Sequence, residues 1–184
     1  MNAGLIAQRY AKALLRYVEE TGNGELAYSQ VTVLVQSFQE VPQFRDALEH
    51  NPELSCEDRV ALMRTALGSE LCDELYRFVQ LVNAHSRMEY LSRMLIVFID
   101  KYRESKNIKV GTLVTAVPQE DLKVRLEALV SAGTESSVNL NTKVDDTLIG
   151  GFVLQVGDLR MDASVSGQFQ RIRNALLEND NRII

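Results

Sequence analysis

The chain has 184 residues and a formal net charge of −5, with 46% hydrophobic and 24% charged residues. This length suits one large domain or two small ones, and the composition allows a buried core under a charged surface. No apolar run approaches the ~20 residues that span a bilayer, and no secretory signal is visible. Neither half of the chain is basic, which argues against a nucleic-acid partner.

Apolar residues between positions 3 and 105 repeat with the period of amphipathic helices. In the first segment Gly22 and Gly24 end the helix, and Pro42 stops the second. A short third helix precedes the Asn51-Pro52 break. The first stripe consists of Ile6, Tyr10, Ala13, Leu14 and Tyr17.

Local signals also bound the next helices. Ser55, followed three residues later by Asp58, predicts the start of the fourth helix, and Gly68 its end. Two further apolar stripes then follow. They are Leu71, Leu75, Phe78, Val79 and Val82, and Leu91, Met94, Leu95, Phe98 and Tyr102. Residues 1–105 are therefore predicted to form a six-helix bundle.

After a polar hinge at residues 105–109 the period changes. Residues 110–117 predict a strand, and Pro118 leads into a helix that Gly133 ends. Residues 138–144 alternate as a half-buried strand does, and Asp145-Asp146 makes the next turn. The face expected to be buried on the helix carries Leu122, Leu126, Leu129 and Val130.

The end of the chain predicts a further strand at residues 152–156, which stops at the turn dipeptide Gly157-Asp158. Leu159 and Met161 extend this strand past the kink, and Asp162 caps a final helix. That helix is expected to turn Val165, Phe169 and Ile172 inward. The predicted class is α+β: the helical bundle of residues 1–105, then a small α/β domain over 106–184 with a β-hairpin and a C-terminal helix.

No catalytic, cofactor or metal site is predicted. Gly150-Gly151 lacks the Lys-Ser/Thr of a phosphate-binding loop. Cys56 and Cys72 are isolated, and His50 and His85 lie far apart in the sequence, without metal-ligand spacing. The acidic neighbours Asp73-Glu74 and Asp145-Asp146 are expected to be solvated pairs. A protein that works through its surfaces is favoured.

The run from Val144 to Asp158 resembles the signature of the ATP synthase delta subunit family, which includes the mitochondrial oligomycin-sensitivity-conferring protein. The continuation from Met161 to Gly167 resembles the family's closing helix, and residues 9–14 its first helix. Thr115 to Pro118 fits the opening strand, although Gln119 stands where a leucine is common. The signature residues are Asp145, Gly150, Gly151, Gly157, Asp158, Asp162 and Gly167, for which structural roles are expected.

This resemblance implies a non-catalytic stator subunit of the proton-translocating F-type ATP synthase, present once per complex. It implies a peripheral position at the cytoplasmic face of the bacterial plasma membrane, with no cofactor. The helical domain would bind the N-terminal helices of the alpha subunits, and the α/β domain the b-type stalk subunits. The resulting strut would keep the catalytic head from turning with the rotor.

The family places the alpha-subunit site in a groove between the first and fifth helices. The lining expected here is Ile6, Tyr10, Ala13, Leu14, Tyr17, Leu75, Phe78, Val79 and Val82, most of which must also hold the bundle together. Tyr10 and Tyr17 suit a surface that is half apolar and half wet. Val165, Phe169 and Ile172 are the candidates for stalk contact.

Two alternatives stay open at this point. One is a two-domain adaptor or scaffold unrelated to ATP synthesis, which composition and periodicity alone do not distinguish. The other is a small enzyme whose site forms across the hinge and uses Cys72 or His85.

Overall fold

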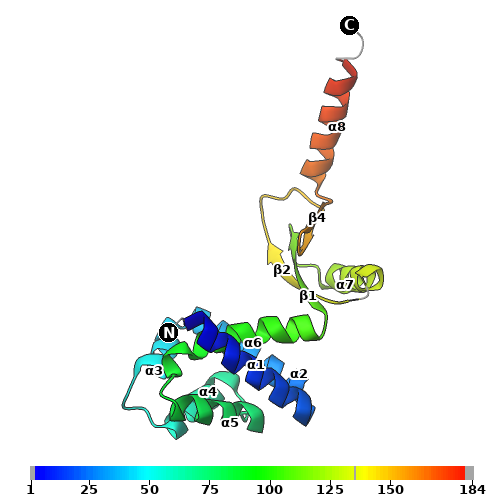
Figure 1. Cartoon of the computed structure of the whole chain (residues 1–184). Helices are drawn as coiled ribbons and strands as arrows, with labels where there is room; N and C mark the ends of the chain where they lie inside the picture. The colour runs from blue at the N-terminus through cyan, green and yellow to red at the C-terminus, as the bar shows by residue number, and fades with distance from the viewer. Residues whose placement is uncertain (1–2, 135, 181–184) are drawn as a thin grey trace. The chain divides into compact units, whose positions relative to one another are not determined.

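The computed structural model describes residues 3–134 and 136–180 and contains both helices and a β-sheet (Figure 1). The chain divides into two compact units, Met1–Ser105 and Lys106–Ile184. The first contains only helices within its described residues, and the second combines a sheet with two helices. The predicted α+β class is confirmed.

The first unit is built around its last helix. Phe98, Leu91 and Met94 of that helix are fully buried, and the helix packs against the first three helices of the unit. This helix is buried on several sides because its apolar stripe faces several neighbouring helices at once. The elements are α1 (Ala3–Thr21), α2 (Gly24–Glu40), α3 (Pro42–His50), α4 (Cys56–Leu67), α5 (Asp73–Ala84), the 3₁₀ helix η1 (Met88–Tyr90) and α6 (Leu91–Ser105).

The predicted limits of α4 are confirmed. The Asp58 backbone N–H donates to Ser55 Oγ at 3.1 Å, and the Ser55 N–H donates to Asp58 Oδ2 at 3.1 Å, which completes a capping box. The hydrogen bonds from Ser55 lower the pKa of the Asp58 carboxyl. Gly68 ends the helix at φ +63°, a conformation that favours glycine.

Two buried charged side chains in this unit were not predicted. The Arg59 guanidinium donates to three carbonyl oxygens, of Leu48, Asn51 and Leu54, and to Asn83 Oδ1, at 2.6–3.1 Å. It therefore ties the α3–α4 connection to α5. Glu74 was expected in a solvated pair, yet it is only 3% exposed, and its Oε1 accepts a 2.7 Å hydrogen bond from the Asn23 amide.

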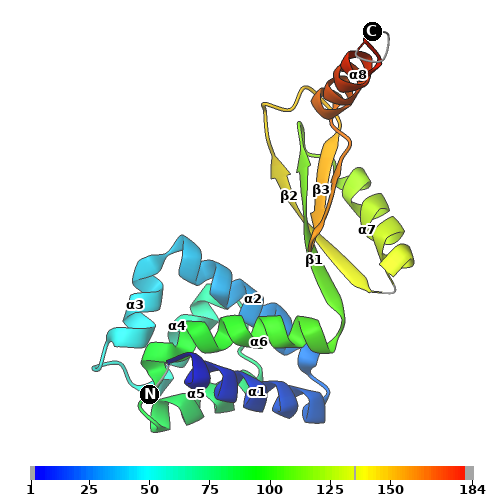
Figure 2. The ribbon, with the colours of Figure 1, turned by 45° about the horizontal axis from the view of Figure 1, so that its top comes forward.

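The second unit contains a four-stranded sheet in the order β2-β1-β3-β4, and Figure 2 shows β1 between β2 and β3. Strands β1 (Ile108–Thr115) and β2 (Ser137–Val144) are parallel and joined by helix α7 (Glu120–Thr134). Strands β3 (Phe152–Val156) and β4 (Leu159–Asp162) follow in antiparallel order, and α8 (Val165–Asp180) ends the described chain. The core between α7 and the sheet consists of Leu113, Leu126, Val138, Leu140, Leu154 and Val156.

Several expectations for this unit need correction. Ser105 belongs to α6 and Ile108 to β1, so the connection is shorter than the predicted hinge. The turn at Asp145-Asp146 does not make a hairpin, because β1 lies between β2 and β3. The hairpin is instead formed by β3 and β4 around Gly157-Asp158. Leu129 is 70% exposed, since the buried face of α7 follows Leu122, Leu126 and Val130.

Candidate functional site

Helices α1 and α5, which the family resemblance singles out, are neighbours in the first unit (Figure 2). The Tyr10 ring stands edge-on to Phe78 at 6.4 Å and to His85 at 6.3 Å between ring centroids. Seven residues further along α1, the Tyr17 hydroxyl accepts a 3.0 Å hydrogen bond from Arg77 Nη1. Since Tyr10 reaches His85, which follows α5, and Tyr17 binds Arg77, about two turns earlier, the two helices run antiparallel.

Burial separates the nine predicted lining residues into two groups. Ile6, Leu14, Leu75, Phe78, Val79 and Val82 are all at most 7% exposed and form part of the core. Tyr10 and Tyr17 are half-buried and Ala13 is exposed. Only these last three are accessible enough to contact a partner directly, and the other six position them.

Three residues that the sequence analysis missed complete this surface. Leu81 of α5 is 45% exposed, and Arg77 and Arg87 bind the two tyrosine hydroxyls. We call the combined surface the α1/α5 face, defined as Tyr10, Ala13, Tyr17, Arg77, Leu81 and Arg87. It has an apolar centre with a tyrosine and a guanidinium at each end.

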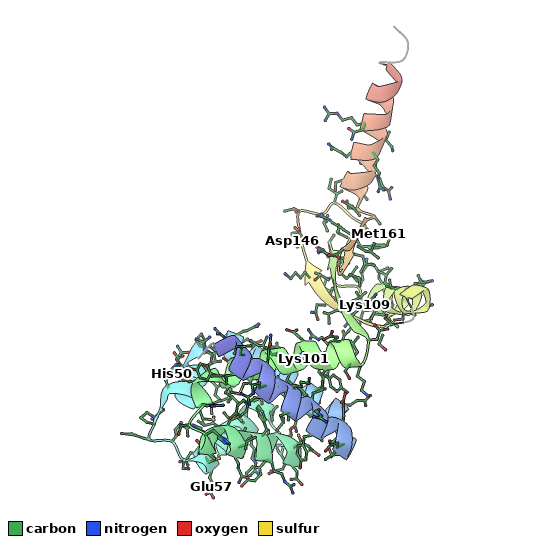
Figure 3. All side chains as sticks on the ribbon, in the orientation of Figure 1. His50, Glu57, Lys101, Lys109, Asp146 and Met161 are labelled. Atoms are coloured by element: carbon green, nitrogen blue, oxygen red, sulfur yellow. The ribbon has the colours of Figure 1, made fainter. Side chains whose placement is uncertain are left out.

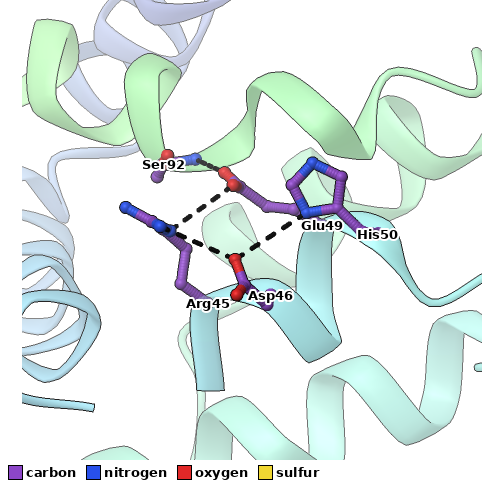
Figure 4. A network of polar contacts seen from close by, with 5 residues as sticks. All are labelled: Arg45, Asp46, Glu49, His50 and Ser92. Carbon is purple, nitrogen blue, oxygen red and sulfur yellow. Dashed lines mark hydrogen bonds and ion pairs between the residues drawn. The ribbon is translucent and has the colours of Figure 1, made fainter. Parts of the chain in front are cut away.

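A hollow of about 280 Å³ lies elsewhere in the unit, between α2, α3 and α6. Its apolar lining includes Phe38 and Ile96, with Arg45 at its polar side. Beside it Glu49 accepts a 2.8 Å hydrogen bond from the Ser92 backbone N–H at the start of α6, as Figure 4 shows. Arg45 is paired weakly with Glu49 at 3.9 Å and Asp46 at 3.6 Å, both within α3, so the link from α3 to α6 is the Glu49–Ser92 hydrogen bond.

The signature residues of the second unit have structural roles. Gly151 adopts φ +79°, and a Cβ there would lie 2.3 Å from the Ala163 carbonyl oxygen. The Ala163 N–H donates to the Phe152 carbonyl oxygen at 2.9 Å, and the Val165 N–H to the Gly150 carbonyl oxygen at 3.0 Å. The predicted close backbone approach is confirmed at Gly151. Gly157 supplies the hairpin turn at φ +57°.

Two of the three signature aspartates, Asp145 and Asp162, each hold a turn. Asp145 Oδ1 accepts from the Thr147 N–H at 2.9 Å and from its hydroxyl at 2.6 Å, and these bonds lower the pKa of Asp145. Asp162 binds Ser164 in the same way, with the same effect on its pKa. The expected cap at Asp162 is wrong by two residues, because Ser164 Oγ accepts the Gly167 N–H at 3.0 Å.

Close packing at Gly167 serves this same turn, since a Cβ there would lie 2.7 Å from Asp162 Oδ1. Asp146 is exposed, as is Asp158 in the hairpin turn, while Asp145 is half-buried. Figure 3 shows Asp146 in the loop that follows β2 and Met161 on β4.

The inward orientation expected for the last helix is wrong. Phe169 is 66% and Ile172 57% exposed, while Val165 is half-buried. Helix α8 extends away from the sheet (Figure 1), so its apolar stripe has no sheet beneath it. On β4, Leu159 and Met161 are 72% and 48% exposed. Their partners in the ladder, Val156 and Leu154, are buried, so these side chains continue the apolar face beyond the part that α7 covers.

The residues proposed for an enzymatic site do not come together. Cys72 precedes α5 and His85 follows it, which separates them by about 18 Å of helix. Burial raises the pKa of the Cys72 thiol, which disfavours the reactive thiolate. In the described residues no group of His, Cys, Asp and Glu side chains is arranged to hold a metal ion. Nor does any helix of the described segments have the length and apolarity needed to cross a bilayer.

Comparison with known proteins identifies the family. The model of the ATP synthase delta (OSCP) subunit family matches residues 6–176. The chain belongs to this family. The ATP synthase subunit delta of Phocaeicola vulgatus is 39% identical, with 100% of both chains covered. Those of Bacteroides thetaiotaomicron and Parabacteroides distasonis are 33% and 36% identical, over 100% and 97% of this chain and 100% and 99% of theirs.

A chain in the cryo-EM structure of the Toxoplasma gondii mitochondrial ATP synthase hexamer shares the fold. The TM-score is 0.60 at 20% identity, with 93% of this chain and 97% of that chain covered. Family membership makes this protein a peripheral-stalk subunit of an F-type ATP synthase, a component of a membrane-associated complex and not a catalytic subunit. The function expected from the signature is confirmed, and the adaptor and enzyme alternatives are set aside.

Proposed function

We propose that this subunit is the strut between the catalytic head and the stalk. Its first unit acts as a six-helix bundle that binds the N-terminal helices of the alpha subunits through the α1/α5 face. Its second unit binds the b-type stalk subunits through the apolar stripe of α8. One copy serves each complex, at the cytoplasmic face of the bacterial plasma membrane.

The α1/α5 face carries the first part of this proposal. An amphipathic partner helix needs apolar contact along its centre and polar contact at its edges. Ala13 and Leu81 offer the first, and Tyr10 and Tyr17 combine both properties in one side chain. The six buried residues beneath keep this surface rigid, so little order has to be created when a helix binds.

The second part rests on exposed apolar side chains that have no role in the folded unit. Phe169 and Ile172 lie on one side of α8 and are more than half exposed. An isolated helix with such a stripe gains stability by packing against another helix. Stalk subunits that reach this region as helices would cover it.

A strut of this kind contains no catalytic group and acts mechanically. Rotation of the rotor exerts torque on the head, and the head turns with the rotor unless it is held. Binding the head at one end and the stalk at the other transmits the counter-torque, so that ion-driven rotation is converted into ATP synthesis.

The test is isothermal titration calorimetry of the full chain with a peptide of about 20 residues, roughly 30 Å as a helix. The peptide copies the N-terminus of the alpha subunit of the same organism. We expect a Kd of about 1 μM or tighter, and a loss of about 2 kcal/mol in Tyr10→Ala.

Tyr28→Ala is the matched control, because the Tyr28 hydroxyl also accepts an arginine hydrogen bond, from Arg103 Nε at 2.9 Å, but lies on α2. Unchanged affinity in a folded Tyr10→Ala variant would remove the α1/α5 face as the site. For the second unit, Phe169→Ser with Ile172→Ser should abolish assembly with the stalk subunits while alpha-peptide binding persists.

A further inference from the structure

We infer that the helix bound at the α1/α5 face carries two carboxylates about two turns apart, one for Arg77 and one for Arg87. This inference rests on the proposed function, and it adds the charge pattern by which the partner helix is recognised. The two guanidiniums and the tyrosines that hold them are the observations behind it.

Each guanidinium is oriented by a tyrosine. Arg77 Nη1 donates to the Tyr17 hydroxyl at 3.0 Å. Arg87 Nη1 donates to the Tyr10 hydroxyl at 3.2 Å, and its Cζ lies 5.5 Å from the centroid of that ring. A guanidinium held in this way keeps further N–H donors for a second partner, and part of the ordering that an ion pair requires has already occurred.

Neither guanidinium has an acidic partner within residues 3–134 and 136–180, where the ion pairs involve other cations. Arg64, by contrast, meets Glu70 at 3.0 Å. Arg9 and Arg16 of α1 likewise form no ion pair among the described residues, so Arg77 and Arg87 are distinguished by the tyrosines that orient them. The positive charges of Arg77 and Arg87 at the α1/α5 face are therefore available to pair with a ligand.

Basic side chains flank the α1/α5 face, although the whole chain carries −5 and the exposed Glu20, Asp73 and Glu89 are also near in sequence. Arg9, Lys12 and Arg16 are exposed on α1, and Arg77 and Arg87 lie on the other side. A partner helix with an acidic rim would be attracted to this region and steered toward it. A basic helix would be repelled, which gives the face specificity.

The spacing follows from helix geometry. Tyr10 and Tyr17 are seven residues apart on α1, about 10 Å along the axis, and each marks the position of one guanidinium. A helix that lies along α1 therefore meets them with carboxylates about seven residues apart. The apolar residues between those carboxylates would lie over Ala13 and Leu81, and the small side chain of Ala13 leaves room for them.

The experiment compares two peptides on the full chain by isothermal titration calorimetry. One copies about 20 residues, or 30 Å of helix, from the alpha-subunit N-terminus of the same organism. In the other every Glu and Asp is replaced by Gln and Asn. We expect Arg77→Gln and Arg87→Gln to weaken binding of the acidic peptide about threefold each and about tenfold together.

The neutral peptide should bind wild-type protein about tenfold more weakly than the acidic one and should be insensitive to both substitutions. Raising the salt concentration should weaken binding of the acidic peptide and leave binding of the neutral peptide unchanged. Arg103→Gln is the matched control, because it removes a guanidinium bound to a tyrosine, Tyr28, away from this face. It should leave both affinities unchanged.

The possible failures are distinguishable. If the acidic peptide binds but neutralisation, salt and both arginine variants have no effect, the charge pattern is refuted and the α1/α5 site stands. If Arg103→Gln weakens binding as much as Arg87→Gln, the effect is general charge and the inference is refuted. If the folded wild-type chain binds neither peptide, the inference falls together with the proposed alpha-subunit site.

Discussion

Replacing Gly151 by alanine should destabilise the second unit far more than the same change at Gly157. Both residues adopt a positive φ, +79° and +57°, which costs a side-chain-bearing residue about 1–2 kcal/mol. At Gly157 nothing lies within 4 Å of the added Cβ. At Gly151 the Cβ would lie 2.3 Å from the Ala163 carbonyl oxygen and 2.9 Å from Ser164 Cα.

This overlap is with backbone, so it cannot be relieved by rotating a side chain. Overpacking of this kind adds about 1–3 kcal/mol. We therefore expect a loss of about 2–5 kcal/mol for Gly151→Ala and about 1–2 kcal/mol for Gly157→Ala. Gly157→Ala is the matched control, because it shares the backbone conformation and lacks the contact.

The distribution of chromophores allows the two units to be followed separately. All six tyrosines lie before residue 105, and the chain contains no tryptophan. Tyrosine fluorescence during urea unfolding therefore reports the first unit alone, while amide hydrogen exchange of β1 and β3 reports the second. Equal effects of the two glycine variants on β1 and β3 would refute the contact with Ala163 as the cause.

Three further substitutions test the fold. Ser55→Ala should lower the stability of the first unit by about 1 kcal/mol. The folded pKa of Asp58 is below its ordinary value of 3.8, so the capping stability is present above that value and is lost as the pH falls through the folded pKa. Below about pH 4 the Ser55→Ala variant should therefore lose less stability than the wild-type protein does, in acid titrations followed by tyrosine fluorescence. Arg59→Lys should cost about 2–3 kcal/mol in the same assay, since an ammonium cannot reach all four acceptors; a loss under about 0.5 kcal/mol would contradict this role. Thr115→Val should be neutral or stabilising by about 1 kcal/mol, measured by hydrogen exchange of β1, because the buried Oγ1 has no hydrogen-bond partner in the described structure. A marked loss of stability would show that this hydroxyl does make a hydrogen bond.

The helical unit could be predicted closely because its limits are set by local chemistry. Gly22 and Gly68 adopt positive φ at helix ends. Pro42 begins α3, with only Val41 between it and the end of α2. Each of these effects acts within one turn of the residue concerned. A sequence pattern can show them without knowledge of the fold.

The sheet could not be predicted to the same degree, because pairing joins residues far apart in the chain. Alternation at residues 138–144 and 152–156 correctly indicated two strands, yet it carries no information on which strand lies beside which. The parallel pairing of β1 with β2 requires the α7 crossover, and this places β1 where a hairpin was expected. The four residues of β4 were too few to show a period of their own.

The α1/α5 face shows the same division between local and non-local information. Apolar periodicity selects residues that are buried, so it identified six core residues on α1 and α5, while the pairing of these two helices was expected from the family resemblance. A binding surface is made of what remains outside that stripe. Arg77 and Arg87 are separated from Tyr17 and Tyr10 by 60 and 77 positions, and no periodicity connects them. They become a pair of sites only because α1 and α5 run antiparallel, which brings each arginine to the tyrosine at its own end of the face. The charge pattern of a partner helix is therefore set by helix packing, and its recognition can change through single substitutions at Arg77 or Arg87 while the core beneath is preserved.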